Sequence, residues 1–426
     1  MDAGRRVVIT GMGAVASIGT GLPAILEVLR AGRSGIRFVE EWAAFGFGSR
    51  VAGLPEANPE SPLLTRKLEK TTSSNGKMAL RATWEALTTA GLEPERLRGA
   101  NVAVLVGVGT GSSIQNYSNC RTVEVERDKF RARGETDFIS TRRVSPYSVP
   151  HVMASTASAN VSVALGVRGE SWAVSSACST GAHAIALGAL LIRTGRYEQV
   201  IAGASDEIDW TRAGAFDAMH ALSRGFNDRP EQASRPFDMR RDGFVISGGS
   251  GVLLLESLAS ARRRGAPIFA ELMGSGANSD GFDMVVPLPE GASEAMRLAM
   301  RDAGIGPDEI DYVNAHGTST PQGDLSEAAA MLEVFGERQP WISSTKSTTG
   351  HAIGAAGSLE AIYTILMLRE GFIAPSRNVD ELDPGCAHLN LVLEPDNRLR
   401  ARTALSNSFG FGGTNACLVL RKWDEK

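Results

Sequence analysis

The sequence predicts an α/β protein built from two copies of one folding unit. Short apolar stretches that suit buried strands alternate with stretches of helical periodicity along the chain, which is the pattern of α/β proteins. Residues 175–185 match residues 343–353 at seven of eleven positions without a gap. A shorter match relates residues 90–97 to residues 303–310. Repeats this far apart indicate duplicated half-domains rather than a solenoid.

We expect the boundary between the two units at the basic segment 262–267, which we interpret as a hinge. The first unit then covers residues 1–265 and contains Cys178, and the second covers residues 266–426. Active sites in open α/β sheets gather at the carboxyl ends of the strands. The two matching turns are therefore expected to meet in one pocket across a pseudo-twofold axis.

The amino-terminal segment 6–19 begins as an apolar strand and continues into glycine-rich sequence. Its three glycines do not fit the G-x-G-x-x-G spacing of a dinucleotide site, so we interpret them as a structural turn. Further helices are expected at 22–31, at 77–90 and between Cys178 and Gly195. Further strands of the first unit are expected at 101–107, 199–205 and 245–256.

A densely charged segment at residues 118–138 interrupts this alternation. Its larger apolar residues are only Val123, Val125 and Phe130. We interpret the segment as a solvated surface excursion, with a partner-docking element as the alternative.

Composition argues against several classes of function. The 426 residues carry a net charge of −4, which gives no support for a nucleic-acid or membrane-surface partner. The four cysteines are widely spaced and form no metal-ligand or disulfide pattern, so a reducing cytoplasm is the expected location. No apolar run reaches the length of a secretory signal core or a membrane span.

Cys178 lies where apolar, β-prone sequence tightens through small residues and runs into helical sequence. We therefore expect it on a strand-to-helix turn, beside the free N–H groups that begin the helix. The helix dipole there favours a thiolate and lowers the pKa of the thiol, which makes a cysteine nucleophilic. For a lone cysteine the alternative is a buried, inert side chain.

Two histidines of the second unit lie where chemistry is expected. His316 follows a predicted strand on a small-residue turn, and His351 lies in the turn that matches the Cys178 turn. Lys346 occupies the position that corresponds to Cys178. Residues 406–415 form a glycine-rich loop whose N–H groups could serve as oxyanion donors.

Asp324 and Glu327 lie near the start of a predicted helix, where carboxylates suit the positive helix end. The remaining histidines with no catalytic context are interpreted as structural. They are His183, which is the repeat counterpart of His351, together with His220 and His388.

Four motifs together resemble the β-ketoacyl-acyl-carrier-protein synthases, the decarboxylating condensing enzymes of the thiolase-like superfamily. The motifs are the cysteine turn at 175–181, the runs at 316–320 and 346–351, and the glycine-rich loop at 407–415. The resemblance covers essentially the whole chain and looks closest to the bacterial type I elongating branch. It implies a thiolase-like five-layer α-β-α-β-α fold with two halves related by a pseudo-twofold axis.

The resemblance also implies a decarboxylative Claisen condensation in fatty-acid elongation. Cys178 takes an acyl chain from acyl carrier protein, and malonyl-acyl carrier protein then supplies the carbanion that gives 3-oxoacyl-acyl carrier protein. His316 and His351 donate hydrogen bonds to the enolate oxygen as neutral imidazoles. Lys346 lies behind the histidines and tunes their charge, and Glu327 pairs with Lys346.

The substrate contacts are implied in the same way. Thr318 and Thr320 bind the pantetheine arm. The N–H groups of Cys178 and Phe411 hold the acyl oxyanion, and Phe244 with Phe411 gates the acyl tunnel. Some relatives hold a structural cation, and the matching residues here are Asn314, Glu360, Ser406 and Asn415.

No cofactor is expected, and the expected partners are acyl carrier protein and a second copy of the chain in a homodimer. A basic cluster is a candidate surface for an acidic carrier protein, with ordinary solvated charge as the alternative. The cluster consists of Arg66, Lys67, Lys70, Arg131, Arg133, Arg142 and Arg143.

Neighbouring branches of the superfamily fit less well. Biosynthetic thiolases use a second catalytic cysteine, and initiating synthases and chalcone-type enzymes use Cys-His-Asn, whereas position 351 here is His. Non-catalytic chain-length partners usually lack the active cysteine that is present here, and a cysteine hydrolase is a further alternative. The long segment 118–138 and the lack of an aromatic residue at 70–75 keep a specialised fatty-acid or polyene-type polyketide ketosynthase open as the second interpretation.

Overall fold

The strands of the two halves of the chain follow the same spatial order in the computed structural model, which describes residues 5–136, 140–395 and 400–424. In the first half the order is β1 (Val7–Ala16), β7 (Gly249–Ser257), β6 (Gln199–Asp206) and β5 (Ala103–Gly107). In the second half it is β8 (Ala270–Ser279), β12 (Thr414–Lys422), β11 (Thr403–Gly410) and β9 (Tyr312–Asn314). Each series has two antiparallel pairings followed by a parallel one. The predicted duplication is confirmed.

The correspondence extends to the outer edges of both series. In the second half β10 (Trp341–Ser343) runs parallel beside β9. In the first half Ser171 takes that place through a parallel bridge to Val104 of β5. The two series join where Val7–Ile9 of β1 pairs antiparallel with β8, so the strands form one continuous sheet.

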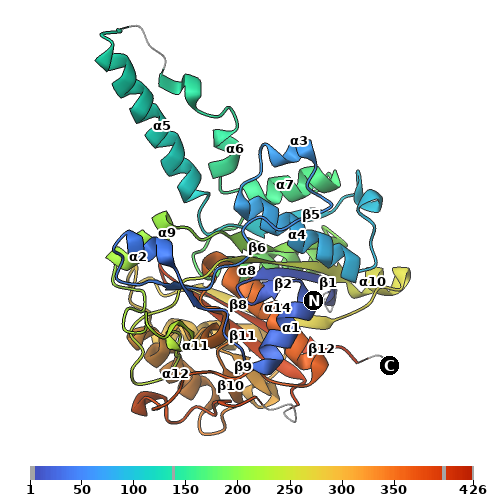
Figure 1. Cartoon of the computed structure of the whole chain (residues 1–426). Helices are drawn as coiled ribbons and strands as arrows, with labels where there is room; N and C mark the ends of the chain where they lie inside the picture. Colours follow the sequence, from blue (N-terminus) through green and yellow to red (C-terminus); the bar gives the residue numbers. More distant parts are fainter. Residues whose placement is uncertain (1–4, 137–139, 396–399, 425–426) are drawn as a thin grey trace.

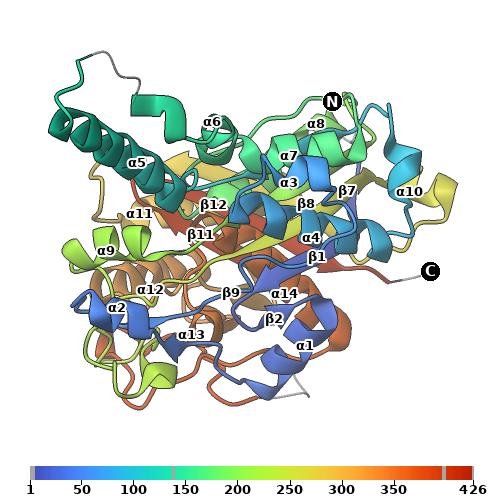
Figure 2. The ribbon, with the colours of Figure 1, turned by 45° about the horizontal axis from the view of Figure 1, so that its top comes forward.

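Helices cover the outer faces of both halves (Figures 1 and 2). The first-half strands carry α4 (Ser74–Thr89) and α7 (Thr156–Leu165). In the second half α11 (Pro289–Ala303) packs on β8 and β12, and α12 (Pro321–Phe335) packs on α11.

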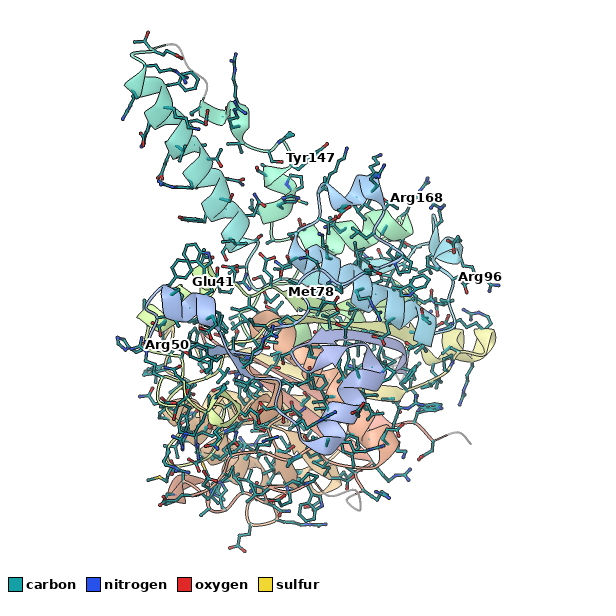
Figure 3. The ribbon with its side chains drawn as sticks, viewed as in Figure 1. Glu41, Arg50, Met78, Arg96, Tyr147 and Arg168 are labelled. Atoms are coloured by element: carbon teal, nitrogen blue, oxygen red, sulfur yellow. The ribbon has the colours of Figure 1, made fainter. Side chains whose placement is uncertain are left out.

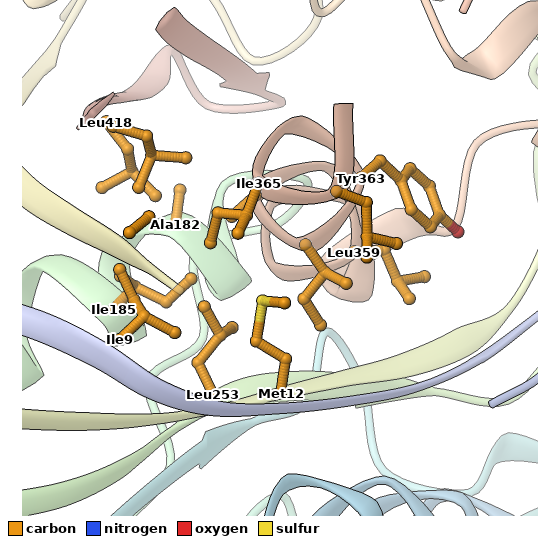
Figure 4. Packing of buried hydrophobic residues seen from close by; sticks show 14 of the residues in the cluster. Ile9, Met12, Ala182, Ile185, Leu253, Leu359, Tyr363, Ile365 and Leu418 are labelled. Atoms are coloured by element: carbon orange, nitrogen blue, oxygen red, sulfur yellow. The ribbon is translucent and has the colours of Figure 1, made fainter. Parts of the chain in front are cut away.

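Two further helices form the middle layer. Both α8 (Thr180–Arg193) and α14 (Ala356–Glu370) contact strands of the first and of the second half. Residues 356–368 of α14 are all buried, which is typical of a helix that is enclosed on every side. Figure 4 shows Leu359 of α14 facing Met12 and Leu253 of the sheet, within the same apolar cluster. The predicted five-layer arrangement therefore holds, and it brings the amino end of α8 close to the segment before α14.

The glycines of β1 serve packing rather than cofactor binding. A Cβ atom at Gly11 would lie 2.1 Å from the Ala86 carbonyl oxygen, and one at Gly13 would lie 2.0 Å from the Ala82 carbonyl oxygen. Glycine at these positions lets α4 approach the strand closely. The expected turn is wrong here, because the strand continues through both glycines to Ala16. The helix predicted at 22–31 is confirmed as α1 (Leu22–Ala31).

The charged segment forms a long helix, α5 (Ser113–Ala132), that stands away from the body of the protein with α6 (Ser148–Val152) beside it (Figure 1). None of the residues of α5 is buried, and Figure 3 shows its side chains extending outward. The described part of the segment is therefore a surface excursion as expected, although its helical form was not predicted, and its residues 137–138 lie outside the described residues. At its base, Tyr117 contacts Trp210 with ring centroids 5.0 Å apart.

The segment expected as a hinge includes the end of a helix, α10 (Leu258–Arg264), that runs to within six residues of β8. The remaining short elements connect the layers. They are β2 (Gly19–Thr20), β3 (Arg37–Phe38), α2 (Glu40–Ala44), β4 (Val51–Ala52), α3 (Arg66–Glu69), α9 (Trp210–Ala218), α13 (Lys346–Thr349) and the 3-10 turns η1 (Pro94–Leu97), η2 (Ser140–Arg143), η3 (Pro230–Gln232), η4 (Pro307–Glu309), η5 (Ile353–Ala355) and η6 (Pro384–Cys386). Within the described ranges, no helix has the length and apolar character needed to cross a membrane.

Candidate active site

Cys178, His316 and His351 lie together in one pocket, although the first comes from one half of the chain and the other two from the second. The pocket has a volume of about 420 Å³ and is lined by residues of both halves. The cysteine sulfur and one nitrogen of each imidazole all lie within 4.8 Å of one another. This is the pocket that the repeat predicts.

The Cys178 turn is strained and held from the second half. Ala177, directly before the cysteine, has a φ of +48°, which a non-glycine residue adopts only where its surroundings impose it. Ser179 Oγ donates to the carbonyl oxygens of Ser408 and Thr414, at 2.9 and 2.6 Å. A Cβ atom at Gly410 would lie 3.0 Å from the Cys178 nitrogen, so only glycine lets the loop approach this closely. These contacts place the cysteine at the amino end of α8, as predicted.

The predicted fall in the pKa of the Cys178 thiol is wrong. Burial in the pocket raises this pKa to about 11, although the Lys346 charge and the Phe411 N–H group act in the opposite direction. The helix end alone does not decide the outcome, because the pocket walls partly shield the half-buried thiol from water. In the resting site Cys178 is therefore a neutral thiol.

The two histidines are neutral and have free ring nitrogens. Their rings meet edge to face with centroids 5.3 Å apart. Burial and the nearby Lys346 charge hold the pKa of both imidazoles well below the ordinary value. Both nitrogens of His351 and Nδ1 of His316 are buried without a hydrogen-bond partner. The site therefore offers uncharged imidazoles that can donate to an oxygen of a bound molecule.

Lys346 pairs with Glu360 of α14 and not with Glu327, which corrects the expected ion pair. Both side chains of the observed pair are buried, with 1% and 3% of their area exposed. Glu327 instead accepts the backbone N–H groups of His316 and Gly317, at 2.9 and 2.7 Å. The reason is its place in the first turns of α12, which point it back at the end of β9. Glu327 thus fixes the backbone that carries His316.

Asp324 also binds backbone rather than substrate. It accepts the N–H groups of Phe237 and Ser319, at 2.8 and 3.1 Å, and lies 3.5 Å from the Arg241 guanidinium. Burial raises its pKa to about 7 against these contacts. Its role is to hold the loop that precedes α12.

The four predicted substrate-contact residues all line the pocket. Two further apolar parts of the pocket wall were not predicted from the sequence. Thr318 and Thr320 hold their hydroxyl groups 3.0 Å apart. Phe216 was not predicted, yet it lies between the expected gate residues: its ring centroid is 5.4 Å from that of Phe244 and 6.4 Å from that of Phe411. No motif surrounds it, and only the fold shows that α9 reaches the pocket. The loop 284–288 is a second part of the lining that was missed.

The four residues proposed for a cation do not come together. Asn314 lies beside Ser406 in the sheet and donates to the Glu360 carbonyl oxygen at 3.4 Å. Asn415 instead donates to Asn278 and Asp280, at 3.0 and 2.7 Å, because it lies on the neighbouring strand near the pocket. The Lys346 ammonium already neutralises the Glu360 carboxylate, so these residues do not fit a cation.

The cysteine and the two imidazoles are the one cluster of potential metal ligands found among the described residues. The Lys346 charge that keeps the imidazoles neutral also disfavours a metal cation beside them.

The other histidines with an assigned structural role lie outside this cluster. His183 Nδ1 lies 2.8 Å from Ser176 Oγ, and His388 Nε2 donates to the Ala328 carbonyl oxygen at 2.9 Å. His220 lies at the rim of the pocket, where its Nδ1 accepts from Arg224 at 2.6 Å. It is nearer to the site than the sequence indicated.

Comparison with known proteins agrees with this geometry. The family model "Beta-ketoacyl synthase, N-terminal domain" matches residues 4–261, and "Beta-ketoacyl synthase, C-terminal domain" matches residues 269–380. The chain is 43% identical to 3-oxoacyl-[acyl-carrier-protein] synthase 1 of Haemophilus influenzae, covering 99% of this chain and 100% of the relative. It is 46% identical to the synthase of the same name from Escherichia coli K12, covering 98% and 99%.

Solved structures agree at the level of the whole fold. A β-ketoacyl synthase from Burkholderia phymatum superposes with a TM-score of 0.89 at 35% identity, covering 99% of this chain and 100% of the other. The ishigamide ketosynthase/chain length factor superposes with a TM-score of 0.87 at 31% identity, with the same coverage. This chain belongs to the β-ketoacyl synthase family.

Proposed function

We propose that the protein is a 3-oxoacyl-[acyl-carrier-protein] synthase that extends an acyl chain by decarboxylative condensation with malonyl-acyl carrier protein. The observation that carries this proposal is the Cys178, His316 and His351 cluster, with its donor atoms within 4.8 Å of one another in a largely apolar pocket. A thiol beside two neutral imidazoles fits acyl transfer followed by formation of an enolate.

In the first half-reaction the Cys178 sulfur attacks the thioester carbonyl of an acyl carrier. The thiol proton passes to the departing pantetheine sulfur, and a new thioester forms on the cysteine. The N–H groups of Cys178 and Phe411 face the sulfur and are positioned for the developing oxyanion.

In the second half-reaction the malonyl thioester loses carbon dioxide, and the electron pair of the broken carbon–carbon bond forms an enolate. His316 and His351 donate hydrogen bonds to the enolate oxygen, which requires both imidazoles to be neutral. The enolate carbon attacks the acyl-cysteine, and the cysteine sulfur leaves and regains a proton. The Lys346 charge supports this step because it lowers the pKa of both imidazoles and so disfavours their protonation.

The carrier protein would approach over the basic residues that the sequence singles out. Its residues Arg66, Lys67 and Lys70 are exposed, and Arg142 and Arg143 are exposed in η2. A solved relative is titled as a type II polyketide acyl-carrier protein in complex with its ketosynthase, at 30% identity to this chain. An acidic carrier surface would be attracted to this cluster, and the rate would fall as salt rises.

A second copy of the chain would cover the outer edge of the first-half strands. Ser171, Trp172 and Ser175 are exposed along this edge, immediately before the Cys178 turn. Open sheet edges readily pair with another chain, and a closed dimer is the commonest solution. A homodimer predicts that Trp172→Asp reduces the molar mass in solution by half, as measured by light scattering.

The four free cysteines fit a reducing cytoplasm as the location.

Fatty-acid elongation is the main proposal for the pathway, because the two full-length relatives described above carry the name of such a synthase. A ketosynthase of a specialised or polyene-type pathway is the second candidate. The long helix α5 and the likeness to the ishigamide ketosynthase favour it.

The test is condensation on purified protein with malonyl carrier and acyl carriers of graded chain length, followed by mass spectrometry of the products and of Cys178. A 3-oxoacyl product and an acyl mass on Cys178 are expected. Cys178→Ala should abolish condensation, and His316→Ala should abolish release of carbon dioxide. Release of free acid without condensation would indicate a hydrolase instead, and turnover by Cys178→Ala would refute the nucleophile.

A further inference from the structure

A buried carboxylate outside the pocket lining joins the two turns that carry Cys178 and His351. Asp206 ends β6 and has no exposed area. Its Oδ2 accepts the backbone N–H groups of Gly109 and Gly354, at 3.0 and 2.8 Å. Its Oδ1 accepts from the Arg212 guanidinium at 2.9 Å. All three partners are donors, so the arrangement suits an ionised carboxylate.

Gly354 connects this carboxylate to the His351 turn. It lies three residues after the histidine, and Ile353 between them has a φ of +50° and lines the pocket. Positive φ at a β-branched residue is strained and persists only where neighbouring contacts hold it. The hydrogen bond from Gly354 to Asp206 is such a contact. A Cβ atom at Gly354 would lie 2.5 Å from Asp206 Oδ2, so glycine is needed for this approach.

Gly109 connects the same carboxylate to the Cys178 turn. Its carbonyl oxygen accepts from Ser175 Oγ at 3.2 Å, three residues before the cysteine. A Cβ atom at Gly109 would lie 2.7 Å from Asp206 Oδ2. Asp206 Oδ2 therefore holds two backbone N–H groups. The one at Gly109 is linked to the Cys178 turn, and the one at Gly354 belongs to the His351 turn.

Arg212 adds a third element to this junction. Its buried guanidinium also donates to the carbonyl oxygens of Glu207 and Thr110, at 2.6 and 3.1 Å. Arg212 belongs to α9, which also carries Phe216 of the pocket wall. The pair therefore links the aromatic wall to the catalytic turns.

We propose that Asp206 is a positioning residue that sets the distance between Cys178 and His351 by holding both turns, and that Arg212 balances its charge beside the nucleophile. This inference rests on the proposed function, and it assigns to the Asp206–Arg212 pair a role in that chemistry.

The charges that act on the Cys178 thiol make the role measurable. Lys346 lowers the pKa of the thiol and Asp206 raises it, while His316 and His351 face the sulfur as neutral groups. Removing the Asp206 charge should therefore lower the pKa of Cys178.

The test combines steady-state condensation with the pH dependence of iodoacetamide alkylation at Cys178. Asp206→Asn keeps the size of the side chain but cannot accept from all three donors. Its kcat is expected to fall by about 10- to 100-fold, as for misplacement of reacting groups, while KM for malonyl carrier stays within about twofold. The midpoint of alkylation should shift to lower pH in Asp206→Asn.

Glu256→Gln is the matched control. Glu256 is also fully buried and paired with an arginine, Arg264, at 2.8 Å, but it lies on β7 at the end away from the pocket. This variant should change stability without moving kcat or the alkylation midpoint.

An unchanged kcat and midpoint in folded Asp206→Asn would overturn the proposal, as would equal shifts in Glu256→Gln. If Asp206→Asn does not fold, the smaller variant Asp206→Ser, which also removes the charge, decides: a shift of the midpoint to lower pH supports the proposal and an unchanged midpoint refutes it. Alkylation needs no carrier substrate, so these outcomes are read separately from any failure of the proposed condensation.

Discussion

Replacing Lys346 by methionine tests the electrostatics that keep the His316 and His351 imidazoles neutral. The substitution retains a long apolar stem and removes one charge from a pair whose side chains are 1% and 3% exposed. Removal of one partner from a buried ion pair costs about 3–5 kcal/mol, because the other charge is left buried without a partner. We expect the free energy of unfolding to fall by about this amount, measured by chemical denaturation.

The double variant Lys346→Met/Glu360→Gln separates stability from chemistry. It removes both charges, so a large part of the lost unfolding free energy should return. The histidines still lack the positive neighbour that lowers their pKa values. In the proposed mechanism, release of carbon dioxide from malonyl carrier needs neutral imidazoles. The acid limb of its pH–rate profile should therefore move to higher pH in both variants. The expected shift is one pH unit for each ~1.4 kcal/mol of lost interaction.

Glu360→Gln alone is the control for the charge itself, because it leaves the ammonium in place. Its acid limb should not move to higher pH. The reasoning is refuted if the acid limb of Lys346→Met matches that of the wild type while the unfolding free energy falls as expected. That result would show that burial alone keeps the rings neutral.

Three further predictions concern the nucleophile, the backbone of His316 and the pocket wall. Burial raises the pKa of the Cys178 thiol to about 11, so its alkylation rate should keep rising up to about pH 11, followed by peptide mass spectrometry. Glu327→Gln keeps one acceptor for the N–H groups of His316 and Gly317, whereas Glu327→Ala leaves both unsatisfied at a cost of about 1–3 kcal/mol each. Carbon dioxide release should therefore fall further in the alanine variant. Equal rates in the two variants would contradict this role. Phe216→Ala opens the wall between the two other pocket phenylalanines, so acylation should shift toward longer chains in competition between carriers, and an unchanged distribution would place the acyl chain elsewhere.

The repeat predicted the duplicated fold and the meeting of Cys178 with His351 in one pocket, whereas His316 was predicted from its own turn after a strand. The matching turns at Cys178 and Lys346 predict two equivalent units, and the observed strand order of both halves agrees. The pKa of Cys178 could not be predicted in the same way. A local pattern indicates the helix end, whereas the rise in pKa comes from burial in a pocket whose lining includes residues more than 200 positions away.

Partners of buried charges were equally beyond the sequence. Glu327 and Glu360 both lie close in sequence to the motifs that contain His316 and Lys346. The sequence therefore does not decide which of the two glutamates pairs with Lys346. Only the packing of α14 in the middle layer places Glu360 against the ammonium. Phe216 and Asp206 were missed for the same reason, since neither belongs to a motif and each acts through an element that folds back on the pocket.

The two copies of the repeated turn differ at the residue before the histidine, and the two histidines lie in different places relative to the pocket. His183 and His351 occupy the same position of the repeat, and the residue before them is Ala182 in one copy and Gly350 in the other. Ala182 continues the helix α8, so His183 lies along that helix beside Ser176. Gly350 has a φ of +69° and ends α13, so His351 leaves the helix and faces Cys178.

Gly350→Ala tests whether this break in the helix creates the catalytic position. Gly350 combines its positive φ with a ψ of −176°, a conformation that costs a non-glycine residue about 1–3 kcal/mol, and the new Cβ atom would lie 2.9 Å from the Val245 carbonyl oxygen. We expect the segment to shift and carbon dioxide release to fall by at least about tenfold, with His351 displaced in a crystal structure. Ala182→Gly is the reciprocal control: it weakens α8 by about 1 kcal/mol, and because Gly181 and His183 remain in helical register, it should not bring His183 into the pocket. Full activity in Gly350→Ala would mean that the position of His351 is set by its other contacts, the backbone pairing with Ile246 and the tether at Gly354.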